Sequence, residues 1–236
     1  MTPDVSYFRR LGHDLRSLPA GGVLAVTVGF LLQISLGGLF TFGNLTTYLT
    51  SYLRGRGGQD VGYGQTVWVG TLMGMTEGLA LLPGSVLYQR YGPRSVVLLG
   101  SVMASGAIAL TSLTVDSSLL WVTMTYSVLN GLGVGLVYSV PMLVGHRWFP
   151  DRKGLVNGLV FGGYSLGGIL FTTVQTSFLN PDNVSPEEDG FFHDAALLDR
   201  VPLVFLLQAG VCAALQLTAV LGLRNPPARN VQAEES

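Results

Sequence analysis

The sequence predicts an all-α integral membrane protein with six transmembrane helices. Charged residues make up 11% of the 236 residues, against about 25% in soluble domains, and the mean hydropathy is +0.46. A helix needs about 20 predominantly apolar residues to cross the hydrocarbon of a bilayer. Six runs reach that length, and Glu77 is the only formally charged residue in them: 22–52, 62–88, 95–115, 118–144, 154–179 and 202–223.

The connection between the second and third runs, residues 85–94, contains Gly92 followed by Pro93. Proline has no backbone N–H to donate and fits the first turn of a helix, so one helix is expected to end here and the next to begin. Arg90 and Arg94 flank the turn. Because short loops rich in Lys and Arg face the cytoplasm, we expect this connection on that side.

The basic residues favour an even number of spans. Residues 1–19 precede an apolar run too long for a signal peptide, so we expect a retained first span behind a cytoplasmic N-terminal segment. After a membrane domain of residues 20–224, six spans return the C-terminus to the cytoplasm, where the polar residues 225–236 are expected to form a disordered tail. With both termini inside, ten of the 13 basic residues are cytoplasmic: Arg9, Arg10, Arg16, Arg90, Arg94, Arg147, Arg152, Lys153, Arg224 and Arg229.

Glycines in the first and fourth runs indicate an internal repeat. Transporters often consist of inverted repeats whose corresponding spans are interrupted by Gly or Pro, and these two runs correspond if spans one to three repeat as spans four to six. The simpler alternative is that Gly is common in membrane helices. We expect a 3+3 inverted repeat, based on Gly37, Gly38 and Gly43 in the first run and Gly131, Gly133, Gly135 and Pro141 in the fourth.

The second and fifth runs carry the densest glycine stripes. Small residues allow helix backbones to approach closely, and this close approach supplies much of the association between helices in lipid. We therefore expect other helices to pack closely against both of these helices along their glycines, which are Gly70, Gly74, Gly78, Gly158, Gly162, Gly163 and Gly167.

Polar side chains at helical spacing form stripes on the first, fourth and fifth runs. Polar groups at membrane depth need a partner or water, so such stripes face the bundle interior or an aqueous cavity. Hydrogen bonding between helices is the alternative and would by itself account for Asn130 and Gln175. The residues expected to line a substrate cavity are Gln33, Thr41, Asn44, Asn130, Tyr138 and Tyr164.

Glu77 lies in the middle of the second run. A charged carboxylate facing lipid costs several kcal/mol, so this side chain is expected to face the interior and to be paired or protonated. A titratable group at that depth is what proton coupling would use. The alternative is a neutral side chain that makes one structural hydrogen bond.

The residue pattern argues against an enzyme or a nucleic-acid-binding protein. The histidines His13, His146 and His193 fall in different loops, and no metal-ligand spacing, phosphate-binding loop or paired membrane carboxylates occur. Basic residues are scattered without interleaved aromatic residues. We expect no enzymatic activity, no metal, no cofactor and no nucleic-acid partner.

Two stretches resemble the major facilitator superfamily. Ser85, Leu87, Arg90, Gly92 and Arg94 fall in step with its signature loop between the second and third spans, although Ser85 stands where a glycine is usual and Gln89 where an acid is usual. The stretch 146–168, HRWFPDRKGLVNGLVFGGYSLGG, resembles the loop and fifth span of monocarboxylate and oxalate/formate porters. Monocarboxylate porters commonly carry a lysine in the first span, and this chain has none there.

The resemblance implies one half of a twelve-span fold, with the first and fourth spans lining a central cavity. It implies a secondary active transporter, or half-transporter, of small organic solutes by alternating access, with monocarboxylate-like anions as candidate substrates and symport through Glu77 as a candidate coupling. Gln89, Arg90, Gly92 and Arg94 would form its gating loop. The alternative is a truncated or non-transporting membrane scaffold. The expected partners are the lipid bilayer, a small-molecule substrate, and a second copy of the chain or a second six-span half.

Overall fold

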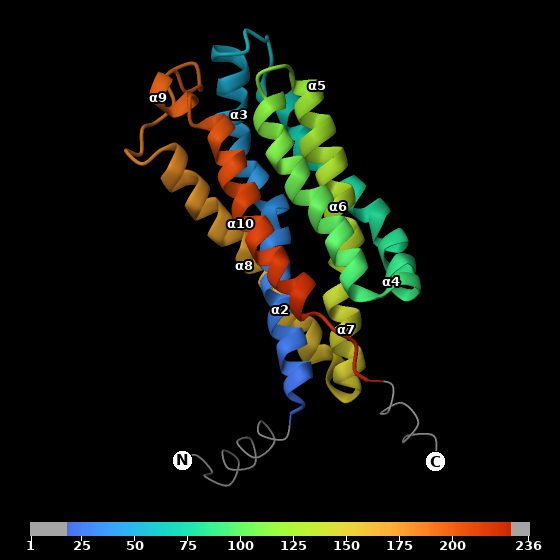
Figure 1. Ribbon diagram of the computed structural model, residues 1–236. Coiled ribbons are helices and arrows are strands. Elements are labelled where there is room, and N and C mark those ends of the chain that lie inside the picture. Colours follow the sequence, from blue (N-terminus) through green and yellow to red (C-terminus); the bar gives the residue numbers. More distant parts are fainter. Residues whose placement is uncertain (1–17, 228–236) are drawn as a thin grey trace, which may run out of the picture.

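The computed structural model describes residues 18–227 as a bundle of long helices (Figure 1). Every regular element in this range is helical. Most of the segments predicted as a cytoplasmic N-terminus and a disordered tail, residues 1–17 and 228–236, lie outside the described residues. The described chain begins and ends at the same end of the bundle (Figure 1).

The first apolar run forms two α-helical segments joined by a 3-10 turn. It comprises α2 (Ala20–Leu36), the 3-10 turn η1 (Gly37–Thr41) and α3 (Phe42–Gly55). At Gly37 the chain passes so close to α8 that a Cβ would lie 2.9 Å from the backbone nitrogen of Gly168 and 3.0 Å from the Cα of Gly167. Only glycine fits there without separating the two helices.

The long helix α4 (Tyr63–Thr114) contains two apolar runs. Its 52 residues would extend about 78 Å as one straight helix, whereas the hydrocarbon of a bilayer is about 30 Å thick. Gly92 interrupts it with φ 79° and ψ 173°, and Pro93 follows. The chain reverses there and runs back beside itself (Figure 1), which confirms the predicted turn.

The remaining elements follow the same up-and-down course. They are α5 (Leu119–Val122), the π-helix η2 (Thr123–Leu129), α6 (Asn130–Tyr138), α7 (Val140–Trp148), η3 (Pro150–Arg152), α8 (Lys153–Leu179), α9 (Ala195–Leu198) and α10 (Val201–Gly222).

Five stretches of the described chain are long and apolar enough to cross a membrane. The six runs of the sequence fall within them to within one residue, because the second and third share α4. The stretches are Ala20–Gly55, Tyr63–Thr114, Leu119–Trp148, Pro150–Leu179 and Ala195–Gly222.

Glycines in α6 allow it to lie directly against both halves of α4. A Cβ on Gly133 would lie 2.6 Å from the backbone nitrogen of Ala104, and one on Gly131 would lie 2.7 Å from the carbonyl oxygen of Met73. Gly135 approaches the backbone of Glu77 in the same way. The fourth-run glycines therefore serve close packing, and α6 holds the segment that carries Glu77 in place.

The connection between α8 and α9 packs onto the end of the bundle opposite the beginning of α2 (Figure 1). Phe192 is 6% exposed, and its ring stacks on Tyr48 with centroids 5.0 Å apart. Phe191 stacks on Tyr63 at 5.1 Å, with the guanidinium of Arg54 4.6 Å from its ring centroid. Aromatic side chains thus fix this loop to the ends of α3 and α4.

Candidate functional site

Glu77 and Tyr164 form a buried hydrogen-bonded pair in the interior. Glu77 is 8% exposed and Tyr164 is 4% exposed. The Tyr164 hydroxyl lies 3.1 Å from one carboxylate oxygen of Glu77 and 3.2 Å from the other. The backbones of α4 and α8 scarcely approach each other, so this pair is a side-chain bridge across the bundle.

Glu77 has no salt-bridge partner among residues 18–227. The side chain faces the interior, as expected for a membrane acid. A carboxylate that is desolvated and lacks a countercharge must receive hydrogen bonds or take up a proton. Tyr164 supplies one O–H donor, which leaves most of the acceptor capacity of the carboxylate unmet.

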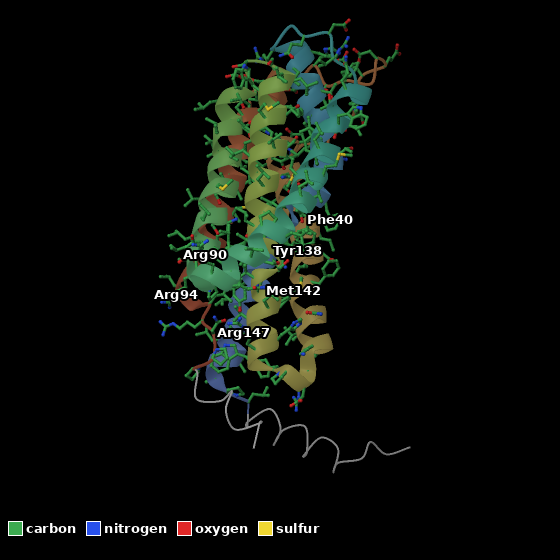
Figure 2. All side chains as sticks on the ribbon, turned by 90° about the vertical axis from the view of Figure 1, so that its right-hand side faces the viewer. Phe40, Arg90, Arg94, Tyr138, Met142 and Arg147 are labelled. Carbon is green, nitrogen blue, oxygen red and sulfur yellow. The ribbon has the colours of Figure 1, made fainter. Side chains whose placement is uncertain are left out.

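Aromatic rings surround Tyr164. Its ring centroid lies 5.1 Å from that of Phe40, 5.2 Å from Tyr138 and 6.1 Å from Phe161, and the first two contacts have edge-to-face geometry. Phe40 is 56% exposed and Phe161 is 47% exposed. Figure 2 shows Phe40 and Tyr138 near each other at mid-height of the bundle, with Met142 one turn farther along. The cluster is therefore buried at Glu77 and exposed at Phe40 and Phe161. We call these two exposed rings, together with Tyr138 and Tyr164, the aromatic wall.

Gln33 joins this cluster from α2. Its Nε2 donates to the carbonyl oxygen of Tyr138 at 3.0 Å, while its Oε1 is buried without a partner in the described part of the chain. The structure thus brings together Gln33, Tyr138, Tyr164 and Glu77, four residues that the sequence placed in the cavity and coupling site. One unpaired amide acceptor lies beside the aromatic wall.

Thr41 belongs to a second buried network. The Nε2 of Gln175 lies 3.3 Å from the Thr41 hydroxyl and donates to the Oε1 of Gln208 at 3.0 Å. Gln208 in turn lies 3.5 Å from the hydroxyl of Tyr126. Gln208 was not among the residues predicted from the sequence, although it is one of only two amides, with Gln216, in the predominantly apolar sixth run. This network connects η1, η2, α8 and α10, and its members are not residues of the aromatic wall.

Asn44 and Asn130 lie apart from the Glu77 cluster. Asn44 is half-buried and its Nδ2 bonds the Thr176 hydroxyl at 3.0 Å. Asn130 is 1% exposed and donates to the carbonyl oxygen of Tyr126 at 3.3 Å. That bond lies within its own helical stretch, but the same amide also donates to the Sδ of Met73 in α4 at 3.7 Å, which fits the alternative in which Asn130 holds helices together.

The predicted gating loop lies toward the opposite edge of the bundle from Phe40 (Figure 2). Gln89 is exposed, and the Arg90 guanidinium lies 5.5 Å from the ring centroid of Tyr91. Arg94 donates to the carbonyl oxygen of Leu221 at 2.9 Å, which places a cation at the C-terminal end of the α10 dipole. With Gly92 at the turn, the loop is tied to α10 within this chain.

A separate charged cluster occupies the exposed end of the α8–α9 connection. The Asp189 carboxylate accepts a hydrogen bond from Nε2 of His193 at 2.8 Å, which raises the pKa of that imidazole. The backbone N–H of Phe191 and then His193 lower the pKa of Asp189. Both side chains are half-exposed, so we assign this cluster no part in the buried site.

Long apolar helices around an acid, a tyrosine pair and unpaired amides define a membrane protein with an internal polar site. The comparison with known families identifies the class further. A model described as Major Facilitator Superfamily matches residues 28–236. The chain belongs to this superfamily of membrane transport proteins.

The similar proteins include carriers named for small carboxylates. Apicoplast pyruvate carrier 1 of Toxoplasma gondii is 31% identical over 88% of this chain and 46% of its own length. Monocarboxylate transporter 9 of Pongo abelii is 28% identical over 69% of this chain and 31% of its own length. The Oxalate:formate antiporter of Oxalobacter formigenes is 32% identical over 43% of this chain and 23% of its own length. The chain therefore spans less than half the length of these relatives.

Proposed function

We propose that the protein is a secondary active transporter, or one half of such a transporter, for small organic solutes, working by alternating access. The observation that carries this proposal is the Glu77–Tyr164 pair behind an exposed aromatic wall. A titratable acid at membrane depth is costly and typically functional. The exposed rings of Phe40 and Phe161 offer a surface for a solute, and the buried Gln33, which donates to the backbone of Tyr138, keeps an Oε1 without a partner among the described residues.

We propose that the chain forms six spans in a 3+3 inverted repeat, one half of a twelve-span fold with both termini in the cytoplasm. The reversal at Gly92 supports two spans within α4. Irregular helix occurs in both the first and the fourth run, as η1 and as η2. Interrupted helices at corresponding positions are typical of inverted-repeat transporters.

We propose monocarboxylate-like anions as the solute class. The names of the similar proteins refer to pyruvate, monocarboxylates, oxalate and formate. Two like charges about 4 Å apart repel each other by about 4 kcal/mol at an effective dielectric constant near 20. An anion would therefore bind beside Glu77 far better when this residue carries a proton, and proton and anion would move together as in a symporter.

We propose that a second polypeptide segment of six spans, or a second copy of the chain, completes the pathway. The glycines Gly78, Gly158 and Gly162 have open space where a side chain would lie. Small residues with no neighbour of their own suit close packing by another helix. The rival proposal is a membrane scaffold that keeps this fold without transporting.

Uptake into liposomes containing the purified full chain tests the proposal. We expect labelled pyruvate to enter faster than labelled sugars or amino acids, and to accumulate when the lumen is alkaline relative to the outside. Liposomes with an equal amount of heat-unfolded chain are the control. Equal, background uptake of all three solute classes, with and without the pH gradient, would favour the scaffold.

A further inference from the structure

A groove of about 240 Å³ lies between the beginning of α2 and the beginning of α8. Apolar side chains from both helices form its walls, among them Val23, Val26, Leu155 and Leu159. Phe149 and Arg152, from the connection between α7 and α8, complete it. The groove thus combines an apolar floor with one guanidinium, and it does not contain Glu77 or its neighbours.

The groove lies at one end of the bundle. Both of its helical walls lie within the first eight residues of a helix, since α2 begins at Ala20 and α8 at Lys153. This is also the end of the bundle at which the described chain begins and ends (Figure 1). The connection here has three exposed basic residues, Arg147, Arg152 and Lys153, against one acid, Asp151.

The groove is unsuited to water. Its volume equals that of about eight water molecules at roughly 30 Å³ each, but a buried water needs two to four polar partners, and most of the lining consists of hydrocarbon side chains. A hydrocarbon chain meets that surface without loss of hydrogen bonds. Arg152 at the same groove presents a guanidinium, whose planar donors match a phosphate oxygen pair.

We infer that this groove binds an anionic phospholipid, with one acyl chain between α2 and α8 and the phosphate on Arg152. Basic pockets between membrane helices recognise anionic headgroups. The charge of the α7–α8 connection favours an anionic lipid over a zwitterionic one. This inference does not depend on transport by the chain.

A second groove serves as an internal comparison. It has a volume of about 290 Å³ and lies between α8 and α10, lined by apolar residues together with Gln175 and Gln208. No charged side chain lines it. It should therefore accept acyl chains without distinguishing between headgroups.

Lipid retention by the full chain, measured by native mass spectrometry in mild detergent, tests the inference. The probes are phosphatidylglycerol and phosphatidylcholine with identical acyl chains. We expect Arg152→Gln to lower the retention of phosphatidylglycerol about fivefold, the factor that one Lys or Arg contributes near an anionic surface. The matched control Lys153→Gln removes the same charge from the adjacent position, which does not line the groove, and should leave most of the retention intact.

Filling the groove provides the second arm. Val23 is 44% exposed, so Val23→Trp can place its ring in the groove without disturbing the packed side of α2. Val23→Trp should abolish the preferential retention of phosphatidylglycerol over phosphatidylcholine, while the melting temperature in detergent stays near that of the wild type. Equal losses in Arg152→Gln and Lys153→Gln, or unchanged retention in Val23→Trp, would overturn the inference. The inference would also be overturned if Val23→Trp displaced a bound second polypeptide instead of lipid.

Discussion

Glu77→Gln is expected to abolish accumulation of solute against its gradient while leaving the fold intact. A pH difference of one unit stores about 1.4 kcal/mol per proton, which supports about tenfold accumulation at one-to-one coupling. Glutamine retains the shape of the side chain and an acceptor for Tyr164, which is 3.1 Å away, but it cannot take up a proton. Labelled pyruvate in proteoliposomes with an imposed pH gradient should therefore reach about tenfold with the wild type and only equilibrium with the variant.

The control for this experiment is Asp60→Asn. Asp60 is an acid in an exposed loop, and its side chain is fully solvated next to Arg54. This change removes one negative charge without touching the buried site, and accumulation should be unaffected. If Glu77→Gln accumulates solute with the same pH dependence as the wild type, Glu77 makes a structural hydrogen bond only.

Two glycines five residues apart on α8 are expected to respond oppositely to substitution. A Cβ on Gly167 would lie 3.0 Å from the Cα of Ile34 and closer still to its carbonyl group, whereas one on Gly162 would have no such atom of the described residues within 4 Å. Gly167→Ala should destabilise the chain by about 1–3 kcal/mol through overpacking against α2. Gly162→Ala should stabilise it slightly, because Ala favours a helix by about 1 kcal/mol over Gly.

Cys212 provides the readout for this pair. It is the only cysteine in the sequence and is buried, so its thiol reacts with a fluorogenic maleimide only after unfolding. Gly167→Ala should react at a lower temperature than the wild type, and Gly162→Ala should not. Equal shifts in both would mean that the α2–α8 approach does not limit stability.

The same positions test for a partner segment. Gly162→Leu fits within the chain but projects a bulky side chain onto the surface proposed to meet a second half or copy. We expect normal thiol protection with loss of the larger species in native mass spectrometry. A wild-type chain that is monomeric, and unchanged by this substitution, would argue for a chain that acts without such a partner.

The sequence predicted the features that depend on local chemistry. Apolar runs of sufficient length became helices, and Gly92 with Pro93 ended one and began another, because hydrophobic length and backbone freedom are local properties. Burial of Glu77 was predictable for the same reason. Its partner was not, since Tyr164 is 87 positions away and becomes a neighbour only through the tertiary packing of the bundle, in which α8 lies on α2 and α4 on α6.

The glycine stripes show a second limit of sequence reasoning. The spacing of Gly158, Gly162, Gly163 and Gly167 predicted close packing for the fifth helix, and the sequence could not tell which neighbour each would meet. In the structure Gly163 and Gly167 pack on the backbone of α2, while Gly158 and Gly162 remain open. Periodicity fixes the direction of a side chain around its own helix, but the neighbour on that side depends on tertiary packing.

The proposed cavity residues divide in the same way. Tyr164 bonds Glu77 and packs on Tyr138, whose carbonyl oxygen accepts from Gln33. Thr41 instead accepts from Gln175, which also bonds Gln208. All of these are polar side chains at membrane depth, which the sequence could identify. Whether each one faces a solute or another helix depends on helix rotations of a few tens of degrees, which the hydropathy pattern does not set.

Proton movement during solute entry tests the central claim most directly. Unlabelled pyruvate is added to weakly buffered proteoliposomes, and the external pH is followed with an impermeant dye. Coupled entry should make the external medium more alkaline with the wild type, and Glu77→Gln should give no change. Pyruvate entry without alkalinisation, or the same alkalinisation with Glu77→Gln, would contradict a transport site built around this carboxylate.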